Sequence, residues 1–358
     1  MTMSLMQSGF TVETVEVHAA GEAGRVIVNM GHLIEGDTMA ERFEYVKANL
    51  DDFRRFILRE PRGYPALCGV FITPPVTEGA DYGIIVLEHG AFTPMSGSNT
   101  ICSVTAMLET GRIPMVEPIT VVKLDTAVGV VTAKAHCSGG KVTAVELENV
   151  PAFLVHKDFP LEVHGYGNVP TDIVFGGQFF AQADLKHFGL TVDANRGKDL
   201  TRVGALVKAA CDEQVTVAHP HNPDINTVNL IFMHEGDPVP GRPARNAMTV
   251  TQGNINVHDP STLTGALDRS PCGTGTSARL AGLHARGLLA VGEELISESP
   301  IGTHFVAKIL GETKVGEYDA VLPSIKGTGY VTGKAEWTLD PIDPFPNGFT
   351  LSDIWAAQ

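Results

Sequence analysis

The sequence predicts an α+β protein made of two related halves. Three observations lead to this prediction: short apolar runs with strand character recur along the chain, few segments have helical periodicity, and one turn-and-helix pattern occurs twice. The chain has 358 residues, of which 43% are hydrophobic and 19% charged. This length and composition suffice for two buried cores of ordinary size.

The first half reads as antiparallel β-structure with inserted helices. Its strand-like runs are TVETVEVHA, GRVIVNM, YGIIVLEHG, TVVKLDTAVGVVTAKA and KVTAVELENV. Helical patterns cover residues 38–59 and 100–109, and Pro61 closes the first pattern because proline cannot continue a helix.

The second half has the same kind of content. Its strand-like runs are VPTDIVFG, EQVTVAH, INTVNLIFMH and NAMTVTQGNINVH, followed by a helix over residues 276–290 and by further strands. We therefore expect an N-terminal lobe of residues 1–160, completed by residues 335–358, and a C-terminal lobe of residues 161–334.

The repeated pattern relates the two halves residue by residue. Residues 95–111 align with residues 271–287 at a constant offset of 176 residues, the separation of Ser96 and Cys272. The matched positions are Gly97 with Gly273, Ser98 with Thr274, Thr100 with Thr276, and Gly111 with Gly287. The two threonines are the expected helix N-caps and the last two glycines the expected C-caps.

Each half would then present one reactive side chain at the start of a helix, Ser96 in the first and Cys272 in the second. A helix N-terminus has free N–H groups and a positive dipole end, so two of them facing each other across a cleft would hold a small carboxylate. The same field would lower the pKa of the Cys272 thiol from its usual value of about 8.5. A thiolate could remove a proton α to the carboxylate while the opposite group returns one, which is racemisation or epimerisation without a cofactor. From the residues alone, a structural cysteine and a turn serine remain the alternatives.

Charge and cysteine usage exclude several classes of protein. The net charge is −15, which repels phosphate backbones and anionic lipids. No apolar run approaches the about 18 residues of a membrane span, and the first residues do not resemble a secretory signal. Five cysteines without a C-x-x-C motif form neither a disulfide framework nor a zinc site, and Cys68, Cys102 and Cys211 are expected to be buried. The sequence thus predicts a soluble, cytoplasmic protein that binds neither nucleic acid nor membranes.

Metal and nucleotide cofactors have little support. His219, His221 and Asp224 are the most metal-like group, but Pro220 and Pro223 between them predict a rigid loop and no second ligand cluster exists. The chain has no G-x-G-x-x-G after a strand and no phosphate-binding P-loop motif. We expect no metal and no cofactor.

Two segments resemble the catalytic motifs of the proline racemase family: MSGSNTI at residues 95–101 and DRSPCGTGTSARLA at residues 268–281. The resemblance spans nearly the whole chain and includes HAAGE (18–22), EPRG (60–63), LDT (124–126), NVPAF (149–153), GGQFFA (176–181) and DPIDPF (340–345). It implies a two-lobed fold similar to diaminopimelate epimerase, each lobe a mostly antiparallel sheet or barrel round a central helix, with the active site in the cleft between lobes. It also implies a proline-like imino acid as the substrate, no cofactor, and a homodimer, although no residue pattern here requires one.

The family's functional residues carry over by position. Cys272 takes the place of the second catalytic thiol and Ser96 that of the first, while Asp268 would meet the ring nitrogen of the substrate. The backbone N–H groups that would bind its carboxylate belong to Gly97, Ser98, Gly273 and Thr274, and Gly275 and Thr276 would shape the turn. The chain departs from the family at two positions, because serine replaces the first thiol and Ser98 replaces a histidine.

This Ser/Cys pair makes a symmetric proline racemase a poor match and leaves three readings. In the first, Ser96 and Cys272 exchange the α-proton from opposite faces, giving a hydroxyproline 2-epimerase, an isomerase. In the second, the α-proton and the 3-hydroxyl leave, giving a trans-3-hydroxy-L-proline dehydratase, a hydro-lyase. Those dehydratases also pair a thiol with a hydroxyl, but in the reverse order. In the third, the chain only binds an imino acid.

Overall fold

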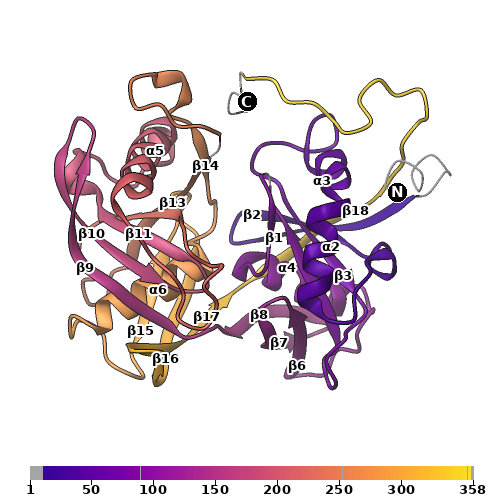
Figure 1. Ribbon diagram of the computed structural model, residues 1–358. Coiled ribbons are helices and arrows are strands. Elements are labelled where there is room, and N and C mark those ends of the chain that lie inside the picture. The colour runs from indigo at the N-terminus through magenta and orange to yellow at the C-terminus, as the bar shows by residue number, and fades with distance from the viewer. Residues whose placement is uncertain (1–10, 89, 252, 353, 356–358) are drawn as a thin grey trace. The chain divides into compact units, whose positions relative to one another are not determined.

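The protein consists of two compact units in the computed structural model, which describes residues 11–88, 90–251, 253–352 and 354–355 (Figure 1). The first unit runs to Leu147 and resumes at Gly327–Trp355, and the second covers Glu148–Lys326. The division lies before the expected lobe boundaries at residues 160 and 334. The reason is that strand β9 (Ala152–Val163) pairs with β10 (Gly167–Phe175) and belongs entirely to the second unit.

The first unit is a sheet of eight main strands in the order β18-β1-β2-β3-β4-β6-β7-β8. Only the β2–β3 and β4–β6 pairs are parallel. Its strands are β1 (Val12–Ala19), β2 (Glu22–Ile27), β3 (Cys68–Thr73), β4 (Tyr82–Leu87), β5 (Phe92–Thr93), β6 (Ile119–Thr126), β7 (Gly129–Ser138), β8 (Lys141–Glu148) and β18 (Gly329–Trp337). Its helices are η1 (Gly31–Leu33), α2 (Met39–Asn49), α3 (Asp51–Leu58) and α4 (Gly97–Glu109).

The second unit is an eight-stranded barrel, β9-β10-β11-β12-β13-β15-β16-β17, closed because β17 pairs back onto β9 through Ala320 and Phe153. Its remaining strands are β11 (Phe179–Asp184), β12 (Val228–His234), β13 (Ala244–Thr251), β14 (Gly265–Leu267), β15 (Glu294–Glu298), β16 (His304–Val315) and β17 (Tyr318–Gly327). Its helices are η2 (Leu185–Phe188), η3 (Ala194–Arg196), α5 (Gly197–Gln214), η4 (Pro260–Thr262) and α6 (Gly273–His284).

The strands of each unit surround one buried central helix. Every residue of α4 from Gly97 to Leu108 is buried, and α4 contacts β1, β2, β3, β7 and β18. Every residue of α6 from Gly273 to Leu283 is buried, and α6 contacts β9, β10, β11 and β16. A helix buried on all sides is uncommon in a protein of this size and occurs where a sheet surrounds it.

The two units have matching topology, which confirms the prediction of two related halves. In both, the strand pairs follow the same series of antiparallel, antiparallel, parallel, antiparallel, parallel, antiparallel and antiparallel. Helices α2 and α3 connect the first parallel pair, β2 and β3, as α5 connects β11 and β12. The central helices α4 and α6 connect the second parallel pair in each unit.

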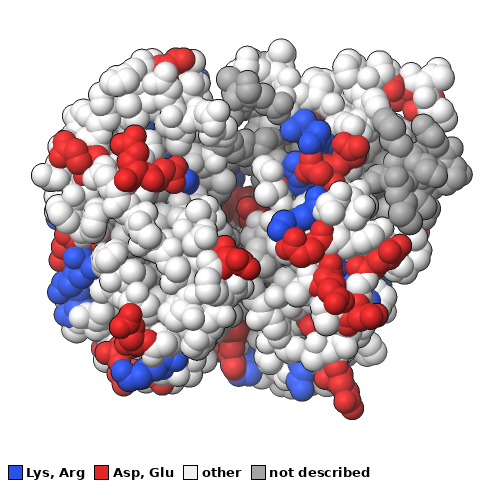
Figure 2. All heavy atoms as spheres, viewed as in Figure 1, with Lys and Arg blue, Asp and Glu red and all other residues white. Residues whose placement is uncertain are grey.

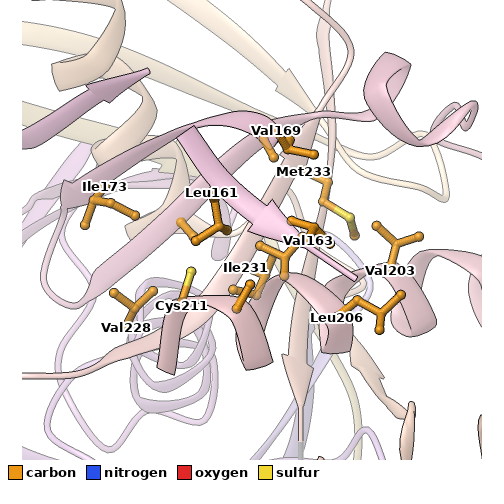
Figure 3. Packing of buried hydrophobic residues seen from close by; sticks show 14 of the residues in the cluster. Leu161, Val163, Val169, Ile173, Val203, Leu206, Cys211, Val228, Ile231 and Met233 are labelled. Atoms are coloured by element: carbon orange, nitrogen blue, oxygen red, sulfur yellow. The ribbon is translucent and has the colours of Figure 1, made fainter. Parts of the chain in front are cut away.

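An apolar cluster of the second unit lies between α5 and the barrel wall (Figure 3). Leu206 and Cys211 of α5 pack there with Ile231 and Val228 of β12. Cys211 and Cys102 are buried as predicted, and burial raises the pKa of Cys211 to about 12. Cys68 is only half-buried and donates its thiol to Glu22 Oε1 at 3.6 Å, so the prediction for this residue was wrong.

Several predicted elements differ from the observed ones. The helix expected over residues 38–59 is broken in two at Leu50, and the strand expected over residues 213–219 is the end of α5 followed by a loop. Helix α5 itself was not predicted, although it buries Leu200, Val203 and Val207 on one face. Among the described residues, no helix is both long and apolar enough to cross a membrane.

Candidate active site

Ser96 is the N-cap residue of α4, four residues before the predicted cap at Thr100. The prediction was wrong because the Thr100 hydroxyl donates to the Ser96 carbonyl oxygen at 2.7 Å, a bond made inside the first turn. Ser96 has extended backbone, with φ −146° and ψ 128°, and its side chain caps no backbone N–H. Its hydroxyl is therefore available to other groups.

The Ser96 hydroxyl contacts two side chains of the first turn of α4. Asn99 donates its amide Nδ2–H to Ser96 Oγ at 3.1 Å, and the Ser98 hydroxyl lies 3.3 Å from the same oxygen. Ser98 and Gly97 are buried and Ser96 is half-buried. The predicted carboxylate-binding residues of the first unit thus lie beside the predicted reactive hydroxyl.

Cys272 is the N-cap residue of α6, and Thr276 lies in the first turn instead of capping it. The Thr276 hydroxyl donates to the Pro271 carbonyl at 2.9 Å, as its counterpart Thr100 does to Ser96. Cys272 has a φ of +60° and is only 4% exposed. A positive φ is unusual for a residue other than glycine, and such strain concentrates at functional sites.

The Cys272 sulfur is surrounded by polar groups. It accepts the Gly275 N–H at 3.3 Å and lies 3.8 Å from the Thr274 hydroxyl. The Cys272 thiol donates a hydrogen bond to the Asp268 carboxylate, which also accepts the Ser270 N–H at 2.7 Å, while Ser270 Oγ accepts the Cys272 N–H at 3.1 Å. The predicted residues of the second unit, Asp268, Cys272, Gly273 and Thr274, therefore form one cluster.

Burial raises the pKa of the Cys272 thiol well above its usual range, and the negative charge of Asp268 raises it further. The Gly275 N–H and the Thr274 hydroxyl oppose this shift but do not reverse it. The expectation that the helix N-terminus lowers this pKa was therefore wrong, because desolvation of the buried sulfur, with the charge of Asp268, outweighs the hydrogen bonds from Gly275 and Thr274. Without a ligand the group is a thiol at neutral pH.

Three further residues make hydrogen bonds to Ser96 or Cys272: Asn99, Ser270 and Gly275. None of them was assigned such a role from the sequence. Gly275 was expected only to shape the turn, yet its N–H is the donor nearest the sulfur. The constant offset of 176 residues was the available signal, because it aligns Asn99 with Gly275. Both residues donate to the reactive atom of their own unit.

The loop with His219 and His221, the most metal-like group of the sequence, packs against apolar residues of the second unit. The His219 ring lies 4.7 Å from the Phe175 ring and 5.8 Å from the Phe153 ring, centroid to centroid. Burial lowers the pKa of His219. Within the described ranges of the chain, no three His, Cys, Asp or Glu side chains are grouped as a metal site.

Charged side chains are mixed on the visible face of the protein. Figure 2 shows acidic and basic side chains interspersed there, with wide uncharged areas between them. The surface that Figure 2 shows thus carries charges of both signs, while the whole chain has a net charge of −15.

Comparison with known proteins finds close relatives. Residues 14–350 match the family model described as proline racemase. A proline racemase of Clostridioides difficile is 37% identical over 97% of this chain and 100% of its own length. A 4-hydroxyproline 2-epimerase of Streptosporangium roseum is 38% identical over the same shares, 97% and 100%.

The fold is also similar to that of a solved structure. A hydroxyproline epimerase from Agrobacterium vitis, crystallised with bound trans-4-hydroxy-L-proline, superposes with a TM-score of 0.88 at 36% identity. The match covers 97% of this chain and 96% of the other.

Proposed function

The chain belongs to the proline racemase family, and we propose that it is a cofactor-independent hydroxyproline 2-epimerase. One observation carries the proposal: each of the two matching units sets a single proton-carrying side chain, Ser96 or Cys272, at the N-cap of its buried central helix. Two such groups are what inversion at an α-carbon requires, since one removes the proton and the other returns it on the opposite face.

The substrate is held by its two charged groups. The first-turn N–H groups of Gly97, Ser98, Gly273 and Thr274 bind the carboxylate, because helix N-termini stabilise anions. Asp268 pairs with the ring nitrogen, which is positively charged in a free imino acid. Binding both groups holds the α-carbon in one orientation for proton exchange.

Substrate binding also prepares Cys272. The charge of Asp268 raises the pKa of the thiol, so a cation paired with Asp268 removes part of that effect. The thiol therefore ionises more easily when the imino acid is bound. Cys272 takes the α-proton, its S–H bond forms as the C–H bond breaks, and Ser96 gives its hydroxyl proton to the other face. The reverse reaction uses the same groups with the roles exchanged.

A hydroxylated substrate fits the Ser/Cys pair better than proline does. Serine is a much weaker acid than cysteine, so the chain lacks the matched pair of thiols of a symmetric racemase. Contacts to a ring hydroxyl supply additional binding energy that can be used in the transition state. The 4-hydroxyproline 2-epimerase relative at 38% identity and the epimerase structure with bound trans-4-hydroxy-L-proline support this choice.

A second candidate is a trans-3-hydroxy-L-proline dehydratase, favoured by the pairing of one thiol with one hydroxyl. In that reaction Cys272 takes the α-proton, the C3–O bond breaks with its electron pair on the oxygen, and the proton on Cys272 passes to the departing hydroxide, giving a pyrroline-2-carboxylate and water. The third candidate, a protein that only binds imino acids, does not account for a strained, buried thiol at Cys272.

The test is incubation with trans-4-hydroxy-L-proline, trans-3-hydroxy-L-proline, L-proline and D-proline in separate samples, followed by NMR. Conversion of the 4-hydroxy substrate to its 2-epimer is expected, and Cys272→Ala is the inactive control. Loss of the ring hydroxyl from the 3-hydroxy substrate would replace the proposal by the dehydratase. Binding by calorimetry without any conversion would leave the binding protein.

We also place the enzyme in the cytoplasm, because Cys272 must remain a thiol and all five cysteines are free. A homodimer is the assembly implied by the family, and light scattering of the purified protein tests it.

A further inference from the structure

The same two positions contact the reactive atom in both units. Two residues after the reactive side chain stands a hydroxyl, Ser98 at 3.3 Å from Ser96 Oγ and Thr274 at 3.8 Å from Cys272 Sγ. Three residues after it stands an N–H donor, Asn99 at 3.1 Å and Gly275 at 3.3 Å. The two sites are therefore built alike, with a hydroxyl and an N–H directed at the atom that carries the proton.

The N–H donor comes from the backbone in one unit and from a side chain in the other. At Cys272 the φ of +60° turns the sulfur onto the Gly275 N–H. At Ser96 the backbone is extended and no backbone N–H of α4 is capped by the hydroxyl. The Asn99 side-chain amide supplies the missing donor at Ser96. Position 275 has no room for a side chain that could do the same, because a Cβ there would lie 2.6 Å from Phe232 and 2.9 Å from the sulfur.

The Asn99 side chain is held for this contact. It is only 2% exposed, and its Oδ1 is buried without a hydrogen-bond partner. An unsatisfied buried carbonyl costs free energy, so the amide is oriented at the expense of stability. Nδ2–H donation to Ser96 leaves the hydroxyl proton of Ser96 directed away from Asn99.

We infer that Asn99 is a positioning residue that makes Ser96 strong enough as an acid to serve opposite Cys272. The inference rests on the proposed epimerase function. When Ser96 gives its proton to the α-carbon, its O–H bond breaks, a C–H bond forms and the electron pair stays on Oγ. The Asn99 N–H stabilises that negative charge by a hydrogen bond and keeps its own proton, in the manner of an oxyanion-hole donor. In the reverse reaction the same N–H stabilises the serine oxygen before it takes the α-proton.

The test is a double-mutant cycle between positions 96 and 99, read as epimerisation kcat and KM. Asn99→Ala in the Ser96 enzyme should lower kcat by about 10- to 100-fold, the effect of losing one hydrogen bond to a developing charge, with KM unchanged. In the Ser96→Cys enzyme the same change should cost less than about 3-fold, because a thiol is acidic enough without the donor and sulfur is a weak acceptor. Equal losses in both backgrounds, or a change confined to KM, would overturn the inference.

A primary isotope effect gives a second readout that a purely structural role would not move. With α-deuterated substrates of each configuration, Asn99→Ala should raise the isotope effect on kcat/KM for only one epimer, the one whose proton goes to Ser96. A rise for both epimers or for neither contradicts the inference.

Asn99→Asp keeps the shape of the side chain and serves if the alanine variant does not fold. Asn246→Asp is the matched control for a buried carboxylate, because Asn246 is also 2% exposed, donates to Ser297 Oγ at 2.7 Å and has an unpartnered Oδ1. Asn99→Asp should lose epimerisation at a melting temperature similar to that of the control variant; retained epimerisation contradicts the inference. If the unmodified enzyme exchanges no α-proton, the proposed function fails and the inference fails with it; an active enzyme with an indifferent Asn99 overturns the inference alone.

Discussion

Gly275 donates its backbone N–H to the Cys272 sulfur over 3.3 Å, at a position with no room for a side chain. A Cβ added at Gly275 would lie 2.9 Å from that sulfur and 2.6 Å from Phe232 Cδ2. The glycine thus leaves room for the Cys272 sulfur beside this N–H.

Gly275→Ala should lower epimerisation kcat at least about 10-fold, because the added methyl group would overlap the Cys272 sulfur and move it out of its reactive position. Gly282→Ala in the same helix is the control, since its Cβ would meet nothing nearer than Asp172 Oδ2 at 3.5 Å. That control should keep its activity and unfold at an equal or higher temperature, because alanine favours a helix by about 0.5–1 kcal/mol over glycine. Equal activity in the two variants would mean that the Gly275 contact is incidental.

Asp268→Asn should lower the pKa of the Cys272 thiol, because the charge of Asp268 is one of the causes that raise it. The measurement is the pH dependence of iodoacetamide labelling of Cys272, followed by mass spectrometry of its peptide, with no substrate present. The labelling midpoint of the variant should lie at lower pH than that of the unmodified enzyme. The same variant should lose substrate affinity. An unchanged midpoint would show that Asp268 does not act on the thiol.

Ser96→Cys should gain racemisation of L-proline, because it restores the two thiols that racemases of this family use. Ser96→Ala should lose inversion of every substrate, with kcat lowered by at least about 100-fold. The assay is circular dichroism or chiral chromatography of the products. Inversion that survives in Ser96→Ala would assign the second proton to another group.

The stability of the protein should fall on acidification because of His234. Burial, followed by the charge of Arg279, lowers the pKa of His234 to about 3. A histidine whose pKa is lower in the folded than in the unfolded state takes up its proton only on unfolding. Its penalty is therefore absent above about pH 6.5 and grows as the pH falls from there towards 3, by up to about 1.4 kcal/mol per pH unit.

His234→Gln should accordingly flatten this part of the curve of unfolding free energy against pH, measured by urea denaturation. His187→Gln, at an exposed histidine, is the control and should leave the slope as it is. If the slope of His234→Gln equals that of the unmodified protein, the acid sensitivity arises elsewhere.

The repeat of residues 95–111 in residues 271–287 made much of the fold predictable. It located both central helices, and the strand topology of the two units repeats as the offset requires. Helix α5 was missed because residues 197–214 mix small and charged residues, and its apolar face becomes evident only against the barrel.

The chemistry of the site was less predictable than its residues. The sequence identifies Ser96 and Cys272 at helix starts, but the pKa of Cys272 depends on its complete burial and on Asp268, which only the folded chain provides. The caps lie four residues before the predicted threonines, because Thr100 and Thr276 bond back to carbonyl groups instead of to N–H groups. In the sequence, the donor Asn99 is marked only by its alignment with Gly275 at the offset of 176 residues.

In the proposed reaction, Ser96 and Cys272 act on opposite faces of one α-carbon. The most direct measurement is the distribution of deuterium at early times when trans-4-hydroxy-L-proline reacts in D₂O. If both groups act, the 2-epimer carries deuterium at the α-carbon while the remaining substrate is still protonated there. Return of the original proton to the product, or elimination of the ring hydroxyl, would contradict the proposed reaction.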